Sequence, residues 1–284
     1  MKGECGYVEL HARSAFSFLR GASQPRELAE AGAAVGLEAM AVCDRGGVYG
    51  TARFHKAARK QGVRPIVGCE LAMEDGCTFP VLIKSRQGYR NLCKLLTQVQ
   101  LRAEKGQGSV RWEELAEFAK GMIALTGDDE GPLHRAWVED GRVGVERALG
   151  RFRGAFADED LGIEVQRHHI RGEQRWVLAL RDLAESERLQ VVATNGVCYA
   201  TQKGRGVQDI FTCLRKKTNL DEAGSLLSCN AQRFVKSSKE MAYLFQDMRE
   251  AVSNTFRVAE RCEFSLENIG YEFPRFPVPK GESM

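Results

Sequence analysis

Short apolar runs recur along the first two thirds of the chain, each four to seven residues long and bounded by polar or glycine-containing stretches. Runs of this length that contain valine, isoleucine and aromatic residues are typical of buried β-strands. We therefore predict seven strands, at Tyr7–His11, Ala39–Asp44, Pro65–Leu71, Pro80–Lys84, Met122–Thr126, Gly162–Gln166 and Val191–Thr194.

Longer segments with helical periodicity separate several of these strands. Pro25 stands near the first turn of one such segment, shortly after Ser23, and another runs from about Glu173 to Leu189 with Trp176 and Leu180 on one face. Regular alternation of strand and helix predicts an α/β protein with a parallel sheet. The periodicity does not decide whether that sheet is open or closed into a barrel.

After Tyr199 the pattern becomes mainly helical, with helices predicted over Asn230–Phe245 and Asp247–Arg261. The chain then reaches a segment in which Pro274, Pro277 and Pro279 exclude a regular helix or a central strand. Such a segment is typical of a linker. We expect it to lead towards a further region of the protein.

Composition narrows the class of protein. The chain is 43% hydrophobic and carries a net charge of only +3, so its overall field does not by itself argue for nucleic-acid binding. Its nine cysteines show no C-x-x-C spacing, which favours reduced cysteines in a cytoplasmic protein over disulfides or a structural zinc site. We see no signal peptide and no run long enough to span a membrane.

Several motifs in order along the chain resemble those of a known family. Tyr7–Ala22, YVELHARSAFSFLRGA, resembles a motif of the form L-H-x-H-S-x-(F/Y)-S-x-L-D-G-A, and Ala41–Gly50, AVCDRGGVYG, resembles A-L-T-D-H-x-x-L-Y-G. Ile163–His168 and Val192–Tyr199 are similar to E-x-Q-R-H and V-A-T-N-D-V-H-Y. These motifs belong to the PHP (polymerase and histidinol phosphatase) domain of bacterial C-family DNA polymerases, the DNA polymerase III α-subunit family.

Further segments resemble the error-prone, damage-tolerant branch of that family, namely Gln208–Ile210, Leu220–Gly224 and Gly270–Pro279. The resemblance implies a distorted seven-stranded (β/α) barrel followed by a mainly helical segment. We expect the barrel over residues 1–200, a helical extension packed on it over 201–270, and a proline-rich linker over 271–284. Functional side chains would lie at the carboxyl ends of the strands.

The resemblance also implies a metal site. Intact PHP domains bind zinc, manganese or iron through histidine and carboxylate side chains and hydrolyse phosphate esters. Ligand-type side chains remain here at His11, Glu70 and His168, and Asp44 remains as a candidate ligand or supporting partner. We expect these four to be vestigial ligands with low metal occupancy, and we expect no cofactor.

The other matching positions have lost their ligands. Arginine replaces the ligand at Arg13, Arg20 and Arg45, and Gly196 and Cys198 stand where the family has aspartate and histidine. Because a guanidinium has no lone pair and stays protonated, it cannot bind a metal and repels one. The sequence therefore predicts an inactive site.

Three readings of these arginines stay open. If the barrel closes, Arg13, Arg20 and Arg45 would converge near Glu70 and Asp44 and pair with them. The same arginines are candidates for phosphate or DNA-backbone binding. The plainer alternative is that they point into solvent on degraded loops.

The function that this resemblance implies is that of a non-catalytic scaffold from an error-prone DNA polymerase, because the acidic palm of such enzymes lies beyond the proline-rich segment. Its expected partners are that polymerase region, on the same protein or on the product of a split gene, together with DNA and replication or repair subunits. The alternative is a standalone metal-dependent phosphoesterase or 3'–5' exonuclease, with a rearranged site that uses His11, Glu70, His168, Cys198 and Asp128. A genomic remnant without a role is a third reading.

Overall fold

All seven predicted strands are confirmed in a computed structural model, which describes residues 6–104 and 106–269. The boundaries differ from the predicted ones by at most two residues. The strands are β1 (Glu9–Ala12), β2 (Ala39–Arg45), β3 (Arg64–Ala72), β4 (Thr78–Ile83), β5 (Met122–Leu125), β6 (Leu161–Val165) and β7 (Gln190–Ala193).

The strands form one curled sheet in sequence order, from β1 to β7. The parallel prediction was wrong for β4, which pairs antiparallel with both β3 and β5. A tight turn joins β3 to β4, and in it the amide of Met73 donates to the carbonyl of Cys77. Because no helix lies between the two strands, β4 runs back beside β3. Pro80 is tolerated in β4 because β5 pairs only from Val81 onwards.

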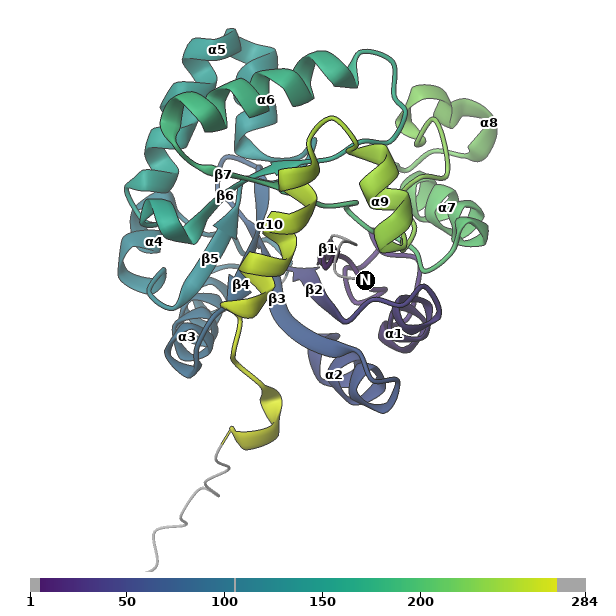
Figure 1. Ribbon diagram of the computed structural model, residues 1–284, viewed down its shortest axis with the longest axis horizontal. Coiled ribbons are helices and arrows are strands. Elements are labelled where there is room, and N and C mark those ends of the chain that lie inside the picture. Colours follow the sequence, from purple (N-terminus) through teal and green to yellow (C-terminus); the bar gives the residue numbers. More distant parts are fainter. Residues whose placement is uncertain (1–5, 105, 270–284) are drawn as a thin grey trace, which may run out of the picture.

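Most of the earlier helices surround the outer, convex face of this sheet, whereas α10 crosses its opening (Figure 1). The helices are α1 (Pro25–Ala34), α2 (Thr51–Lys60), α3 (Arg86–Arg102), α4 (Trp112–Phe118), α5 (Pro132–Arg153), α6 (Glu173–Glu187), α7 (Arg205–Lys216), α8 (Leu220–Ala223), α9 (Ser238–Leu244) and α10 (Arg249–Glu260). The predicted helices at Glu173–Leu189 and Asp247–Arg261 are confirmed as α6 and α10.

The helix predicted over Asn230–Phe245 was wrong in its first half. Phe234 instead forms a β-bridge with Tyr199, and the helix begins only where Ser237 and Glu240 form a capping box. The two hydrogen bonds of this box satisfy backbone amides at the start of α9 and so fix its beginning. Residues 271–284, the predicted linker, lie outside the described residues.

The concave face of the sheet encloses a second apolar cluster, separate from the one under the outer helices. Its members come from six strands and from α10, and include Leu10, Ala41, Ile66, Ile123 and Val258. Side chains thus fill the lower part of the barrel, as in other small barrels. The polar side chains gather at the other end, where the parallel strands finish.

The gap between β1 and β7 is closed differently at its two ends. Near the carboxyl ends, an isolated bridge joins Ala12 to Val197 just beyond β7. Near the amino ends, α10 crosses the gap, as Figure 1 shows: Thr255 Oγ1 accepts a hydrogen bond from the amide of Val8, and Asn254 donates to the carbonyl of Val191. Side chains of α10 therefore replace the missing strand partner.

Within residues 6–104 and 106–269, no helix is both long and apolar enough to cross a bilayer.

Candidate functional site

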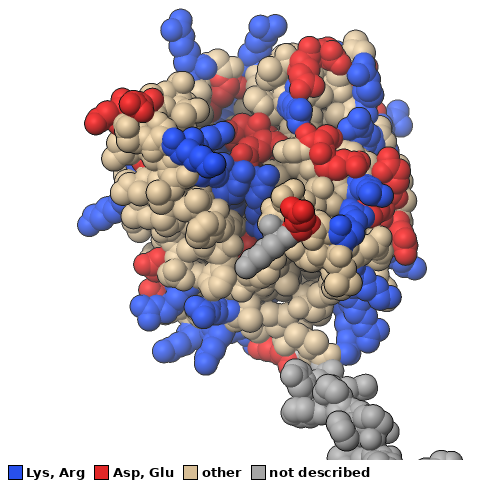
Figure 2. All heavy atoms as spheres, turned by 180° about the vertical axis from the view of Figure 1, so that it is seen from behind, with Lys and Arg blue, Asp and Glu red and all other residues tan. Residues whose placement is uncertain are grey.

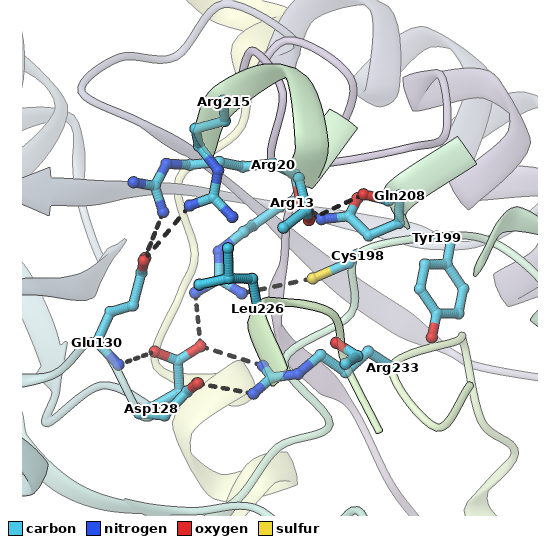
Figure 3. Close-up of a pocket in the computed structure, with 13 residues that line it drawn as sticks. Arg13, Arg20, Asp128, Glu130, Cys198, Tyr199, Gln208, Arg215, Leu226 and Arg233 are labelled. Atoms are coloured by element: carbon cyan, nitrogen blue, oxygen red, sulfur yellow. Dashed lines mark hydrogen bonds and ion pairs between the residues drawn. The ribbon is translucent and has the colours of Figure 1, made fainter. Parts of the chain in front are cut away.

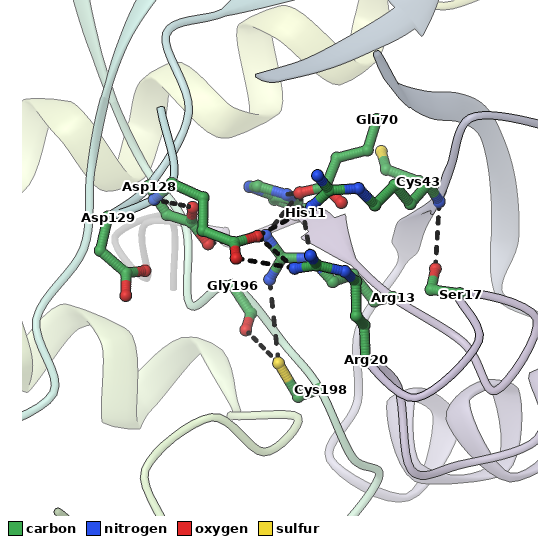
Figure 4. Close-up of polar contacts among 12 residues, drawn as sticks. His11, Arg13, Ser17, Arg20, Cys43, Glu70, Asp128, Asp129, Gly196 and Cys198 are labelled. Atoms are coloured by element: carbon green, nitrogen blue, oxygen red, sulfur yellow. Dashed lines mark hydrogen bonds and ion pairs between the residues drawn. The ribbon is translucent and has the colours of Figure 1, made fainter. Parts of the chain in front are cut away.

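Functional side chains from the ends of several strands, among them β1, β3 and β5, meet at the mouth of the barrel (Figure 4). Figure 2 views the molecule from the side opposite α10, and there basic side chains cluster near the middle of the face with acidic ones beside them. At the mouth, basic and acidic side chains are in direct contact, as in the pairs of Arg13 with Glu70 and Asp128.

Arg13 lies at the centre of this arrangement and is almost fully buried, with 4% of its surface exposed. Its Nε donates to Glu70 Oε1 at 3.0 Å, and its Nη2 donates to both Glu70 Oε1 and Asp128 Oδ2, the latter at 2.7 Å. One guanidinium thus bridges two buried carboxylates. Burial by itself would raise the pKa of Glu70, but Arg13 and His11 outweigh it and lower that pKa to about 2.

His11 is held between two carboxylates. Its Nδ1 lies 2.7 Å from Glu164 Oε1 and its Nε2 lies 3.1 Å from Glu70 Oε1. Burial alone would lower the pKa of His11, yet these carboxylates raise it to about 10. His11 is therefore an imidazolium that donates on both sides, and neither ring nitrogen offers a lone pair.

A second cluster lies nearer the surface (Figure 3). Glu130 accepts hydrogen bonds from Nη1 of both Arg20 and Arg45, and Nη1 of Arg215 on α7 lies 3.7 Å away. Three guanidinium groups share one carboxylate here. Burial and the neighbouring Arg20 lower the pKa of both Arg45 and Arg215, so positive charge is in excess at this rim.

Arg233 provides a further cation next to these two clusters. Its guanidinium contacts Asp128 Oδ2 at 3.3 Å and Asp129 Oδ1 at 2.7 Å. Gly196 lies under it with φ of 53°, and a Cβ there would come within 2.9 Å of Arg233 and 2.5 Å of Gln166. The Arg233 guanidinium therefore lies against Gly196, the position at which the family has an aspartate. Cys198 is buried, and its sulfur lies 3.8 Å from Arg13 Nη1.

Two of the four predicted ligands lie apart from this centre. Asp44 accepts hydrogen bonds from the Ser14 amide and hydroxyl, the Ser17 hydroxyl and the Gly50 amide. A side chain at Gly50 would collide with the Asp44 carboxylate. Asp44 therefore fixes a loop, and no arginine pairs with it within the part of the chain that the structure describes. The expected pairing of arginines with Asp44 is corrected accordingly.

His168 is the other outlying residue. Its Nε2 donates to the carbonyl of Asn195 at 2.9 Å. Burial, reinforced by the charge of Arg233, lowers its pKa to about 3, so the ring is neutral. This hydrogen bond ties the end of β6 to the loop that follows β7.

The remaining side chains fit a divalent cation poorly. Within the described ranges, one group of three side chains, His11, Glu70 and Asp128, brings potential ligand atoms within 4.8 Å of one another. Glu70 Oε2 is also buried without a hydrogen-bond partner. However, the Arg13 guanidinium already lies between the two carboxylates, and His11 has no free lone pair. A metal ion would have to displace a buried cation.

Three residues that build the site were not singled out from the sequence, namely Glu164, Glu130 and Arg233. Asp128 entered only in the alternative reading, and Arg215 belongs to the basic run Arg215–Lys217, which suits a DNA contact or a solvated turn. The acidic run from Asp128 to Glu130, placed directly after a predicted strand, was the signal that could have identified Glu130. Nothing local in the sequence marks Arg233.

Comparison with known proteins gives the class to which this fold and site belong. The family model described as "PHP domain" matches residues 9–168. That stretch is more than half of the chain, and the chain therefore belongs to the PHP domain family. The mouth described above is the place where the family implies a metal site.

Similarity to curated proteins is more specific. The chain is 34% identical over 280 residues, 98% of its length, to the error-prone DNA polymerase of Caulobacter vibrioides. It is 35% identical over 286 residues, covering 96% of the chain, to the error-prone DNA polymerase of Anaeromyxobacter dehalogenans. The resemblance to the error-prone branch is confirmed. The chain spans about a quarter of the length of these relatives, 25% and 24%.

A solved structure supports the fold. An amidohydrolase from Chromobacterium violaceum superimposes with a TM-score of 0.50 and 15% identity, over 68% of this chain and 88% of that one. At this identity the likeness concerns the fold alone.

Proposed function

We propose that this chain is the PHP domain of an error-prone polymerase-like protein and acts as a non-catalytic scaffold, in which Arg13 takes the place of a metal ion. The observation that carries this proposal is the bridge from Arg13 to Glu70 and Asp128. A cation that is built into the fold neutralises the carboxylates permanently. It supplies neither a Lewis acid nor an activated water, and these are the two contributions that a metal ion makes to phosphoester hydrolysis.

The charge balance of the centre supports this reading. His11 and Arg13 face Glu70, Glu164 and Asp128, and Arg233 is shared between Asp128 and Asp129, so each of these carboxylates has a cationic neighbour. Buried charges persist in proteins when they are paired and hydrogen-bonded. The centre is thus complete without a metal ion.

The scaffold would support the remaining three quarters of a polymerase, supplied by the same protein or by the product of a split gene. In this proposal residues 1–200 form the barrel, 201–270 a helical extension and 271–284 a linker. Because α10 closes the barrel, the extension belongs to the same folding unit. In this proposal polymerase activity belongs to that further region, the partners are replication or repair subunits, and the location is cytoplasmic.

The rim arginines would contact the DNA backbone in this proposal. Arg13 is fully paired, so of the three predicted phosphate-binding arginines only Arg20 and Arg45 retain spare charge, and Arg215 joins them. Arg20 and Arg215 line a pocket of roughly 160 Å³, and Arg45 adjoins it through Glu130. Glu130 would be the internal group that a phosphate competes with.

Phosphate titration tests this contact. Inorganic phosphate should raise the melting temperature of the protein, and the increase should grow in Glu130→Gln and shrink in Arg20→Ala. Arg181→Ala, on the exposed face of α6, is the matched control and should behave as the parent. An identical increase in melting temperature in all four proteins would mean that the rim arginines do not bind the phosphate.

A second function, a metal-dependent phosphoesterase or 3'–5' exonuclease, is favoured by a different observation. His11, Glu70 and Asp128 form a compact ligand group, and Glu70 Oε2 has no hydrogen-bond partner. In that case Arg13 would have to swing away and His11 would have to lose a proton. Cys198 lies close enough to Arg13 to be included in such a rearranged site.

Metal content separates the two functions. The purified protein should hold less than about a tenth of an equivalent of zinc, manganese or iron, and Arg13→His should gain metal because it restores a neutral ligand beside His11. Arg181→His is the matched control. Gly196→Asp should be introduced only after Arg13→His, since its side chain would collide with Arg233 and Gln166. One tightly held equivalent in the parent, with metal-dependent hydrolysis of a phosphodiester, would overturn the scaffold.

A further inference from the structure

A second hollow adjoins the mouth of the barrel, and none of the three arginines around Glu130 lines it. It has a volume of roughly 430 Å³ and lies between α5, α6 and the ends of β5 and β6. Asp128, Asp129 and Arg233 line both this hollow and the pocket at the rim. We call it the tryptophan pocket, because Trp137 and Trp176 form its wall.

The aromatic wall is assembled from two helices. The ring centroids of Trp137 on α5 and Trp176 on α6 lie 5.5 Å apart with an interplanar angle of 43°, and His134 packs edge-on against Trp176 at 5.4 Å. Both indoles are only half-buried. A break in α5 at Gly141, with φ of 60°, ends the segment that carries Trp137. Both indoles pack partly against the core and line the pocket together, so aromatic ring surface is available for a ligand to stack on.

The edge of the pocket carries uncompensated positive charge. Arg171 and Arg175 are exposed, and neither pairs with an acidic side chain within the described ranges. The guanidinium of Arg175 lies 5.9 Å from the ring centroid of Trp137. The acidic groups nearby are engaged, since Asp128 and Asp129 pair with Arg233, and Glu173 accepts from the His168 amide. An anionic group of a ligand could therefore bind at Arg171 and Arg175.

The pocket also reaches a buried acceptor without a partner. Glu164 lines it and is 1% exposed. Its Oε1 accepts from Gln166 and Thr194 and contacts His11, whereas its Oε2 has no hydrogen-bond partner. A buried acceptor in this state is destabilising until a donor reaches it. A ligand with an amino group directed at Glu164 would supply that donor.

We propose that the tryptophan pocket binds a nucleobase that carries a phosphate, with the base stacked on Trp137 or Trp176, its amino edge towards Glu164 and its phosphate at Arg171 and Arg175. Bases stack on aromatic side chains irrespective of sequence, and arginine adds attraction to the phosphate. The volume suits one small ligand. The ligand is either a free nucleotide or one nucleotide of a single strand, since both present the same chemistry. The site does not depend on a metal ion or on the scaffold function.

Tryptophan fluorescence offers a direct test, since two of the three tryptophans of the chain form the wall. The protein, in buffer with a chelator, is titrated with deoxyadenosine monophosphate, thymidine monophosphate, inorganic phosphate and single-stranded oligomers of adenine or thymine. Saturable quenching is expected with the adenine ligands. Thymine, which lacks an amino group, should bind more weakly. Quenching by the mononucleotide would identify a free nucleotide, and quenching by the oligomer alone would identify a strand.

Two variants assign the quenching to this pocket. Trp176→Leu and Arg175→Ala should each weaken binding by roughly tenfold, followed by anisotropy of a labelled adenine oligomer or by calorimetry with the mononucleotide. Arg181→Ala, also on α6, should leave binding unchanged. Arg175→Ala alters an exposed side chain, so it remains informative if Trp176→Leu unfolds. No saturable response to any base, an equal response to inorganic phosphate, or unchanged binding in Arg175→Ala would overturn the proposal, whatever the metal content proves to be.

Discussion

The two ends of the barrel close the same gap between β1 and β7 by different physical means. At the amino ends, α10 fills the opening with apolar side chains such as Val258 and Ala259 and satisfies free backbone groups through Thr255 and Asn254. At the carboxyl ends, a backbone bridge from Ala12 to Val197 is followed by a layer of buried ion pairs. The interior is apolar at the amino ends, where the ion pairs of Asp160 with Lys84 and Arg261 lie nearer the surface, and it is charged at the carboxyl ends. We call the two ends the neutral end and the charged end after these interiors.

Under the proposed function, this difference accounts for a fold that persists without a metal ion. The carboxylates of a metal-binding mouth would repel each other without the ion, so a cation must replace it or the carboxylates must go. In this proposal Arg13 provides that cation, whereas the interior at the amino ends is filled by apolar side chains. The stability of the two ends should therefore respond differently to substitution.

The largest effect is expected at the charged end. Arg13→Ala would leave Glu70 and Asp128 buried without their main counter-charge, and should lower the free energy of unfolding by about 3–5 kcal/mol. Urea denaturation measures the loss. Adding Glu70→Gln should recover part of it, because the two residues are in direct contact. A loss below about 1 kcal/mol would mean that the ion pairs do not hold the mouth.

A smaller effect is expected at the neutral end. Thr255→Val keeps the volume but leaves the Val8 amide without its acceptor, and should lower the free energy of unfolding by about 1–3 kcal/mol. Because no charge is involved, raising the salt concentration should not change this loss. Ser253→Ala is the matched control, since that hydroxyl donates only to the Glu250 carbonyl of the same helix. Equal effects of the two substitutions would show that α10 does not need this contact to close the barrel.

The neutral end was also the easier one to predict from the sequence. Runs such as Ala39–Asp44 are continuous in the chain, so their burial can be read locally, and the boundaries of β2 differ by one residue. The antiparallel direction of β4 could not be read this way. It depends on a five-residue turn that replaces a helix, and on the pairing partners that this turn brings together.

At the charged end, Glu70 was named from the sequence as a partner of the arginines and Arg13 does pair with it, whereas Asp128 and Glu130 were not named as partners. Arg13 pairs with Asp128, which lies 115 residues further along the chain, and Arg20 and Arg45 meet at Glu130. These pairings depend on how far each side chain extends across the mouth, and a sequence motif does not contain that information. Asp44 has the identity of a ligand, yet its hydrogen bonds to Ser14, Ser17 and Gly50 consume its oxygens.

The smallest effect on stability is expected from a buried ammonium group at the charged end. Lys236 donates to Asn195 Oδ1 at 3.0 Å, and within the described residues it forms no ion pair. Burial lowers its pKa from 10.5 to about 8. Between these values the unfolded chain holds the proton more often than the folded one, so the contribution of Lys236 to stability rises with pH and is constant at its lowest value below pH 8.

Lys236→Met lacks this group, so the free energy of unfolding of the parent should increase relative to the variant by about 1 kcal/mol between pH 7 and pH 9. Urea denaturation of both proteins at several pH values measures the difference. The tyrosines and cysteines that titrate in the same range are common to both proteins and cancel. Thr255→Val, at the neutral end, should run parallel to the parent over the same range. Parallel curves for Lys236→Met as well would mean that water reaches this ammonium group and that the charged end is less closed than the ion pairs around Arg13 imply.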